Sequence, residues 1–451
     1  MNSGEKAKIL FVLPQYKGVS KAPLMRRWAP RTFSFYPMSV PILAALTPED
    51  SFEFEFVNEY WGEQVDYDCE ADLVAMSFLT PSTPRAYEVA DKFRDRGKPV
   101  VMGGVHASLC VEEAAPHADA VIVGEAEETF PQFLQDFLDG TMKSRYDPSR
   151  PVPPDLIPIP DRGVAKRPWK LSNISMMATR GCPFGCDFCS VSRYFGKRIR
   201  CRPVDSVIEE LDTALALEEQ KTRLVVFKDD NLLIDRHYAS DLLERLIPLN
   251  IRWAAQSNIK ALDDPELIRL MVKSGGILAT VGLESVKPDH VAQYRKSYED
   301  PKRVKEVIDR LHSHNIFVWG SYMFGYDDDT PASIEATYEQ AKYLELDLVT
   351  FNVLTPFPGT ALHQRFASEG RLLEKGWEYY DVEHSVFKPR LMTQEELMRS
   401  THRVVRRYYS GGDISRRMAR TVRRSWESRR YVPLSYVLFF NLAAWAIARK
   451  L

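Results

Sequence analysis

Residues 181–189 read Gly-Cys-Pro-Phe-Gly-Cys-Asp-Phe-Cys and bring Cys182, Cys186 and Cys189 within eight residues of one another. Three thiolates this close can hold one face of a compact metal cluster, and glycine and proline suit a tight loop around it. A zinc site ordinarily takes four ligands in paired spacings, but the next cysteine, Cys201, is twelve residues further on. Three cysteines on a cluster of four irons leave one iron open to a substrate. A zinc loop and three buried thiols remain alternatives.

The cysteine stretch directly follows an apolar, strand-like run, and strands and helices alternate after it. The expected strands are Ser175–Thr179, Leu224–Phe227, Arg252–Gln256, Leu278–Gly282, Phe317–Met323 and Val349–Val353. The expected helices between them are Val204–Leu217, Tyr238–Leu246, Pro265–Ser274, Lys302–His312 and Pro331–Leu344. Six such units predict a (βα)6 partial TIM barrel, whose reactive face is formed by the carboxyl ends of the strands. The three cysteines lie at that face.

The residues before the barrel predict a second α/β unit. Strands are expected at Lys8–Leu13, Phe52–Val57, Leu73–Phe78, Pro99–Met102 and Ala120–Val123, with helices Pro84–Arg96 and Glu127–Leu138. This alternation is typical of a doubly wound, Rossmann or flavodoxin-like sheet. Six prolines between 148 and 160 then interrupt it. We therefore expect a front domain at 1–140, a linker at 141–172, the barrel at 173–390 and a C-terminal helical region at 391–451.

The bulk composition excludes several classes of protein. A chain of 451 residues is too long for one compact core. Its 60 basic and 62 acidic residues nearly cancel, so nothing global indicates nucleic acid as a partner. Six cysteines are too few for a disulfide scaffold of this length. The first residues show no secretory signal pattern, so a cytoplasmic location is expected.

The Cys-x3-Cys-x2-Cys spacing, with the aromatic Phe188 before the last cysteine, resembles the signature of the radical S-adenosylmethionine (radical SAM) superfamily. The resemblance implies a [4Fe–4S] cluster on the three cysteines. Its fourth iron would chelate the amino and carboxylate groups of S-adenosylmethionine, and reduction would give a 5′-deoxyadenosyl radical. An electron donor such as flavodoxin or ferredoxin is then expected.

Other S-adenosylmethionine contacts implied by the resemblance are Phe188, Asp230, Ser257 and Glu284. Phe188 would lie beside the adenine, and the other three stand at the ends of the second, third and fourth barrel strands. The alternatives are a strand-ending turn with an Asx cap for Asp230, a polar turn for Ser257 and a salt bridge or cap for Glu284. No residue is predicted to act as a general base.

In the front domain, Ser77 and the pair Gly103–Gly104 end two consecutive strands, so their loops meet at one edge of the sheet. Paired glycines let a ligand approach the backbone closely. These loops resemble cobalamin-binding domains, in which the nucleotide tail of the cofactor threads between them. The implied cobalamin contacts are Ser77, Leu79, Thr80, Gly103, Gly104, Val105, His106, Gly124 and Glu125.

The front domain departs from many cobalamin domains in one respect. The Asp-x-His-x-x-Gly segment, whose histidine coordinates cobalt, is missing, and residues 14–36 contain no histidine. The resemblance is therefore to the class in which the corrin binds with no histidine on cobalt. Loss of the cofactor is the alternative.

The order of the two domains implies a cobalamin-dependent radical SAM enzyme of the methylase-like class. We expect methylation of an unactivated carbon in a small molecule. A radical enzyme that cyclises, oxidises or couples carbon skeletons without net methyl transfer is one alternative. A non-catalytic cobalamin or iron–sulfur sensor is an alternative of another class.

The C-terminal region gives the only sequence clue to the substrate. Ten arginines lie between Arg403 and Arg430, against two acidic residues, and Tyr431–Ala448 is mostly apolar. Arginines beside an apolar surface suit an anionic membrane face, so peripheral contact with the inner face of the membrane is one interpretation. A transmembrane helix, or a helix packed on the barrel, are the others. Membrane attachment would favour a lipid-like or tetrapyrrole substrate.

Overall fold

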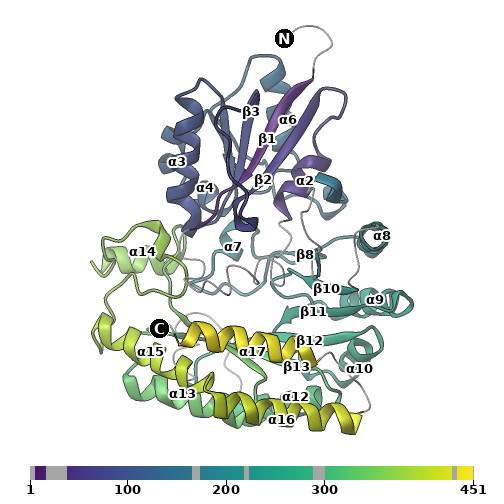
Figure 1. Cartoon of the computed structure of the whole chain (residues 1–451), viewed down its shortest axis with the longest axis vertical. Helices are drawn as coiled ribbons and strands as arrows, with labels where there is room; N and C mark the ends of the chain where they lie inside the picture. Colours follow the sequence, from purple (N-terminus) through teal and green to yellow (C-terminus); the bar gives the residue numbers. More distant parts are fainter. Residues whose placement is uncertain are drawn as a thin grey trace.

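The computed structural model describes residues 6–16, 38–164, 173–217, 223–287, 300–428 and 434–449. Two parallel β-sheets are stacked along the long axis of the molecule (Figure 1). The N-terminal sheet lies at the top of this view, the second sheet below it, and the C-terminal helices run along one side of the second sheet. The cysteine loop follows β8 and is drawn between the two sheets.

The N-terminal sheet has six parallel strands in the order β2-β1-β3-β4-β5-β6. The strands are β1 (Ala7–Leu13), β2 (Phe52–Asn58), β3 (Leu73–Ser77), β4 (Val100–Gly103), β5 (Ala120–Ile122) and β6 (Arg145–Tyr146). Helices α3 (Thr83–Arg94), α4 (Val105–Leu109) and α5 (Val111–Ala114) cover one face, and α2 (Ser39–Ala45) and α6 (Thr129–Leu138) cover the other. The doubly wound prediction is confirmed.

Strand β6 differs from the sequence prediction, because it lies inside the segment 141–172 that was expected to be a linker. Arg145 and Tyr146 pair with β5 as the sixth strand of the sheet. The prolines begin only at Pro148, so nothing in the backbone prevents these two residues from pairing.

The second sheet has the strand order β14-β13-β12-β11-β10-β7, all parallel, with β14 and β7 at its two edges. The strands are β7 (Ile174–Met176), β10 (Leu224–Phe227), β11 (Arg252–Ser257), β12 (Gly276–Glu284), β13 (Phe317–Phe324) and β14 (Leu348–Val353). The helices on its outer face are α8 (Val204–Ala216), α9 (Arg236–Leu246), α10 (Pro265–Lys273), α12 (Pro301–Ser313) and α13 (Pro331–Tyr343). The partial barrel is confirmed.

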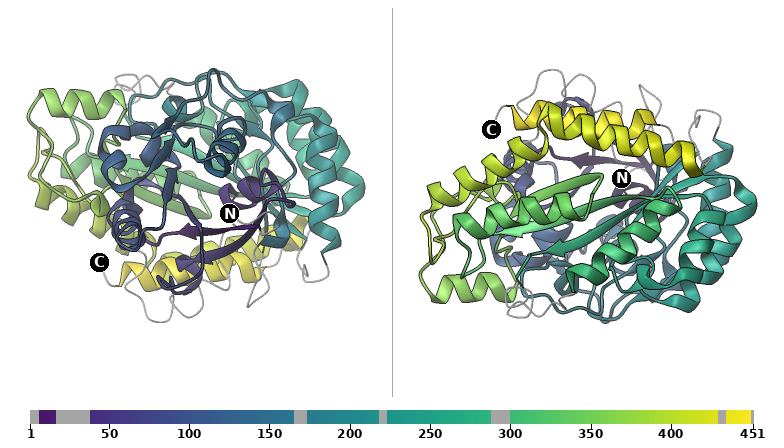
Figure 2. Two further views of the ribbon diagram at one scale, coloured as in Figure 1. Left: turned by 90° about the horizontal axis from the view of Figure 1, so that it is seen from above. Right: turned by 90° about the horizontal axis from the view of Figure 1, so that it is seen from below.

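Three long helices follow the short helix α14 (Ala361–Ser368): α15 (Gln394–Tyr408), α16 (Gly411–Ser428) and α17 (Leu434–Ala448). Both views of Figure 2 show α16 and α17 along one side of the second sheet. Two of the arginines face the protein, since Arg417 binds Asn441 of α17 and Arg424 binds Asp347 of the barrel. Among the described helices, none combines the length and the apolar character needed to cross a bilayer.

Candidate active site

The three cysteines lie on a loop that β8 (Thr179–Arg180) leads into. Strand β8 pairs antiparallel with β9 (Arg200–Cys201), and Gly181 then turns the chain at φ +86°. A Cβ atom on Gly181 would lie 2.3 Å from the carbonyl oxygen of Arg198, so only glycine fits. The amide of Cys189 donates to the oxygen of Cys186 at 3.1 Å, which folds the loop back on itself.

The thiols of this loop fit the ligand set of a three-cysteine cluster. Cys182, Cys186 and Cys189 are half-buried and form no disulfide. Burial raises the pKa of Cys189, and the charges of Asp230 and Cys182 raise it further. Iron binding would overcome this shift, because a coordinating thiol is deprotonated by the metal.

Asp229 and Asp230 follow β10 and have different surroundings. Asp229 is buried and accepts hydrogen bonds from the amides of Ala178 and Thr179 and from the Thr179 hydroxyl, at 2.5 to 3.1 Å. It therefore fixes the chain just before the cysteine loop. Burial, and then the neighbouring Asp229, raise the pKa of Asp230 to about 7. Asp230 follows the carboxyl end of β10, on the side of the sheet where the cysteine loop lies.

The second predicted S-adenosylmethionine contact, Ser257, faces the outside of the barrel. Its hydroxyl is buried and lies 3.2 Å from Oδ1 of Asn231, so it joins β11 to the loop after β10. The neighbouring Gln256 lines the inner face instead. Glu284 lines the inner face as well, and it adopts the left-handed conformation at φ +61°. Such a conformation is costly for a residue other than glycine and is concentrated at functional sites. Phe188 packs against the barrel core.

The inner face of the second sheet lines a partly open cavity of about 430 Å³. Alternate residues of the strands point inward, as the two-residue period of a strand requires. Lys228, Gln256 and Glu284 lie at the carboxyl ends of their strands, on the side of the cysteine loop. Burial lowers the pKa of Lys228 to about 7. Lys228 and Gln256 belong to the same two polar strand ends from which Asp230 and Ser257 were selected as contacts.

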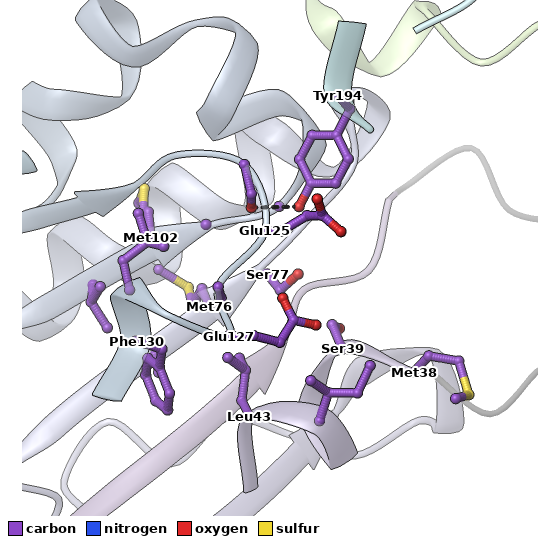
Figure 3. A pocket seen from close by; sticks show the side chains of 18 of the residues that line it. Met38, Ser39, Leu43, Met76, Ser77, Met102, Glu125, Glu127, Phe130 and Tyr194 are labelled. Carbon is purple, nitrogen blue, oxygen red and sulfur yellow. Dashed lines mark hydrogen bonds between the residues drawn. The ribbon is translucent and has the colours of Figure 1, made fainter. Parts of the chain in front are cut away.

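A second cavity, of about 170 Å³, lies between the carboxyl edge of the N-terminal sheet and the loop region around Arg180 and Tyr194. Figure 3 shows Ser77, Glu125 and Glu127 around it. Of the predicted cobalamin contacts, the lining contains Ser77, Gly103, Gly104, Gly124 and Glu125. It also contains residues that the sequence analysis missed: Met38, Ser39, Leu43, Met76, Met102, Glu127 and Phe130.

Gly104 and Glu127 indicate that this cavity fits a ligand group. Gly104 has φ +92°, and a Cβ atom there would lie 2.7 Å from both the amide nitrogen and the carbonyl oxygen of Phe78. Glycine at position 104 therefore lets the bare backbone after β4 pack directly on Phe78 at the edge of the cavity. Oε2 of Glu127 is buried without a hydrogen bond, and buried polar atoms of this kind usually have a partner.

Four predicted cobalamin contacts lie elsewhere. Leu79, Thr80, Val105 and His106 are absent from the cavity lining, and Leu79 is 59% exposed. His106 is completely buried among Phe78, Tyr87 and Trp377, whose ring lies 5.0 Å away. Burial lowers the pKa of His106 to about 4. The segment 17–37, which includes most of the loop that lacks a cobalt-binding histidine, is outside the described residues.

A buried ion-pair network, here called the Arg180 network, joins the strand before the cysteine loop to the N-terminal domain. The guanidinium of Arg180 binds Glu125 and Glu127, each at 2.6 Å, and Arg200 binds Glu125 at 2.7 Å. The Tyr194 hydroxyl donates to the oxygen of Gly124 at 2.8 Å. Because Arg180 directly precedes the cysteine loop and both glutamates belong to the N-terminal domain, the network fixes the loop against that domain.

Comparisons with known proteins agree with both halves of this description. Residues 29–134 match the family model of the B12 binding domain, and residues 176–341 match the Radical SAM superfamily. The chain is 31% identical to bacteriochlorophyllide d C-12(1)-methyltransferase of Chlorobaculum tepidum, over 92% of this chain and 89% of that protein. It is 26% identical to hopanoid C-2 methylase of Rhodopseudomonas palustris, over 75% of this chain and 65% of that protein.

A solved structure shares the fold across the whole chain. The radical S-adenosylmethionine methyltransferase TsrM from Kitasatospora setae, with cobalamin and a [4Fe–4S] cluster bound, superimposes with a TM-score of 0.73. The alignment covers 99% of each chain at 14% identity. The two-domain order of the chain is therefore that of a known architecture.

Proposed function

The chain belongs to the B12-binding radical SAM family of methyltransferases, and we propose that it methylates an unactivated carbon of a small, largely apolar molecule. Its cofactors are a [4Fe–4S] cluster, S-adenosylmethionine and cobalamin. When bound, these groups supply a radical that removes a hydrogen atom from carbon and a methyl group that replaces it. Membership of this enzyme family argues against the alternative of a non-catalytic cobalamin or iron–sulfur sensor.

The residues of the chain hold and orient these groups. Cys182, Cys186 and Cys189 would bind three irons. Asp230 and Glu284, at the carboxyl ends of their strands, would orient S-adenosylmethionine, together with Lys228 and Gln256. Lys228 is suited to the carboxylate of the methionyl group, because an anion beside it would offset the cost of burying its ammonium group.

The N-terminal cavity would take part of the cobalamin. Gly103 and Gly104 bring backbone without side chains to the cavity lining, while Ser77 and Glu127 offer hydrogen-bonding oxygens. The observation that carries the proposal is the Arg180 network. It ties the cysteine loop to the loop of Glu125 and Glu127 with ion pairs of 2.6 Å, which supports a substrate bound between two cofactors in near-contact geometry.

The class of substrate is proposed from two observations. The two methyltransferases compared above act on bacteriochlorophyllide d and on hopanoids, both large ring systems with much apolar surface. The C-terminal helices α16 and α17 expose apolar side chains, with Trp426 at 75%, beside the exposed Arg423. This combination suits a peripheral contact with an anionic membrane, from which a lipid-like or tetrapyrrole substrate would be taken. The electron donor is proposed to be a flavodoxin or a ferredoxin.

Transfer of an isotopically labelled methyl group tests the proposal. The anaerobically reconstituted protein, with reductant and labelled S-adenosylmethionine, is incubated separately with bacteriochlorophyllide d and with a hopanoid. We expect one of them to gain a labelled methyl group, with 5′-deoxyadenosine and S-adenosylhomocysteine formed in equal amounts. Cys189→Ala should abolish the formation of both the methylated product and 5′-deoxyadenosine. Substrate-dependent formation of 5′-deoxyadenosine without labelled product would favour cyclisation or oxidation and overturn methylation.

A further inference from the structure

The cavity inside the second sheet differs in character between its two ends. At the carboxyl ends of the strands it is lined by Lys228, Gln256 and Glu284. At the amino ends it is lined by apolar residues, each the first or second residue of its strand: Leu224, Ile277, Phe317 and Leu348. S-adenosylmethionine, with its charged methionyl group and its ribose, is complementary in polarity to the polar end. The apolar end is therefore suited to a different, apolar ligand group.

Helix α17 forms a wall of this cavity at its apolar end. Val437 is buried against Ile277 and Phe317, and the ring of Phe440 lies 5.6 Å from that of Trp319. Figures 1 and 2 show α17 beside the sheet, on the side not covered by the outer helices. The helix therefore covers the inner face that a partial barrel leaves uncovered.

The attachment of α17 combines one polar anchor with apolar contacts. Oδ1 of Asn441 accepts two hydrogen bonds from Arg417 of α16, at 2.7 and 3.1 Å. Leu438 and Leu442 of the same helix are exposed, at 41% and 47%. The inward side chains, Val437 and Phe440, thus form the cavity wall, whereas Leu438 and Leu442 can be altered without changing it.

The cavity inside the second sheet is large enough to hold a sizeable ligand group. Barrel interiors are normally filled by layers of side chains. An engineered apolar cavity of about 150 Å³ already binds benzene, and this cavity is about 430 Å³. A barrel that keeps such a space is therefore suited to a ligand that fills it.

We propose that the apolar end of this cavity binds a hydrocarbon part of the substrate, remote from the methylated carbon, and that Val437 and Phe440 of α17 set the length it accepts. The inference rests on the proposed function, because it assigns this space to the methyl acceptor. The ligand class is an aliphatic or alicyclic hydrocarbon group that extends from the polar end of the cavity along the barrel.

Displacement of a fluorescent probe by n-alkanols tests this inference without substrate turnover. N-phenyl-1-naphthylamine, which is uncharged and fluoresces in apolar surroundings, is bound to the full reconstituted chain and displaced by alkanols from hexanol to hexadecanol. We expect affinity to rise about fourfold with each methylene and to stop rising at one chain length, where the cavity is full. A rise that continues to the longest alkanol, or no displacement, would overturn the inference.

Substitutions that fill the cavity from opposite walls locate the binding site. Val437→Trp from α17 and Leu278→Phe from β12 should each weaken probe binding at least tenfold and shorten the optimal alkanol. The matched control is Leu442→Ser, which alters the exposed face of α17 and should change binding less than twofold. If only Leu442→Ser weakens binding, the probe binds the outer surface of the helix and the inference is wrong.

Radical chemistry is measured on the same samples, so that the two proposals fail separately. Formation of 5′-deoxyadenosine with reductant and S-adenosylmethionine, but without probe displacement in wild type, would refute the hydrocarbon site and leave the proposed function standing. Probe displacement with the expected chain-length limit, but without 5′-deoxyadenosine, would refute the radical methylation and leave only a hydrocarbon-binding cavity.

Discussion

Substitution of Arg180 by methionine removes the cation at the centre of the Arg180 network. The guanidinium pairs with Glu125 and Glu127, and all three side chains are at least 94% buried. In the variant, Glu127 has no partner left in this network, whereas Glu125 keeps Arg200. Removing one partner of a buried pair typically costs about 3–5 kcal/mol, because an uncompensated charge stays buried. We expect a loss of this size in the free energy of unfolding.

A matched control separates burial from the number of ion pairs. Arg236 also binds two carboxylates, those of Asp264 and Glu266, at 2.5 and 2.8 Å, but its side chain is 58% exposed. Arg236→Met should therefore cost about 0–1 kcal/mol. Urea unfolding, followed by circular dichroism on the reconstituted protein, measures both variants. Adding Glu127→Gln to Arg180→Met should recover part of the loss, because it neutralises the unpaired carboxylate.

The same variants test whether the network positions the two cofactor sites. In Arg180→Met, the ratio of methylated product to 5′-deoxyadenosine should fall about tenfold, because near-contact geometry is lost while S-adenosylmethionine is still cleaved. Arg236→Met should leave the ratio unchanged. The reasoning is refuted if Arg180→Met and Arg236→Met agree within about 1 kcal/mol and give equal product ratios.

Three further results are expected. Gly104→Ala should lower the melting temperature and weaken cobalamin binding, measured by the corrin absorbance, because its Cβ would lie 2.7 Å from the Phe78 backbone. The control is Gly97→Ala: its φ is +71° and no atom lies within 4 Å of the added Cβ, so it should show only the backbone strain of about 1 kcal/mol. Burial lowers the pKa of Lys228 from 10.5 to about 7, so between these pH values the unfolded state binds more protons and the free energy of unfolding should rise with pH. In Lys228→Met, the free energy of unfolding should rise less steeply with pH over this range. Asp347→Asn should cost about 3–5 kcal/mol in urea unfolding, because it leaves the buried guanidinium of Arg424 without its carboxylate. Burial opposes ionisation of Asp347, but interactions with His312 and Arg424 outweigh it and hold the pKa of Asp347 below its usual range. The wild type should therefore lose the stability contributed by this carboxylate only as pH falls below about 4.

The sequence predicted the two sheets because their signals are local. Each strand is a short apolar run, and the observed bounds of β10 are those predicted, Leu224–Phe227. The cysteine loop could also be predicted from the sequence, since three ligands of one cluster lie within eight residues. Strand β6 was missed because two residues beside a proline-rich stretch carry no periodicity.

The details of the site were harder to predict because they depend on faces and on contacts distant in sequence. Ser257 and Gln256 are neighbours, but in a strand a step of one residue moves a side chain to the opposite face, so the choice of Ser257 selected the outer face. His106 was selected for its place after Gly104, but α4 turns it into the core beside Trp377. The Arg180 network joins residues 53 and 55 positions apart from two domains. No pattern within either domain indicates this contact.

The central claim is that Cys182, Cys186 and Cys189 hold a [4Fe–4S] cluster with one iron open to S-adenosylmethionine. The direct measurement is the iron content, and the yield of 5′-deoxyadenosine, of the anaerobically reconstituted protein with all three cysteines replaced by alanine. Cys69→Ala, in the N-terminal domain, is the control and should keep both. We expect the triple variant to retain neither cluster iron nor nucleoside cleavage. Retention of both at the level of the control would contradict the account.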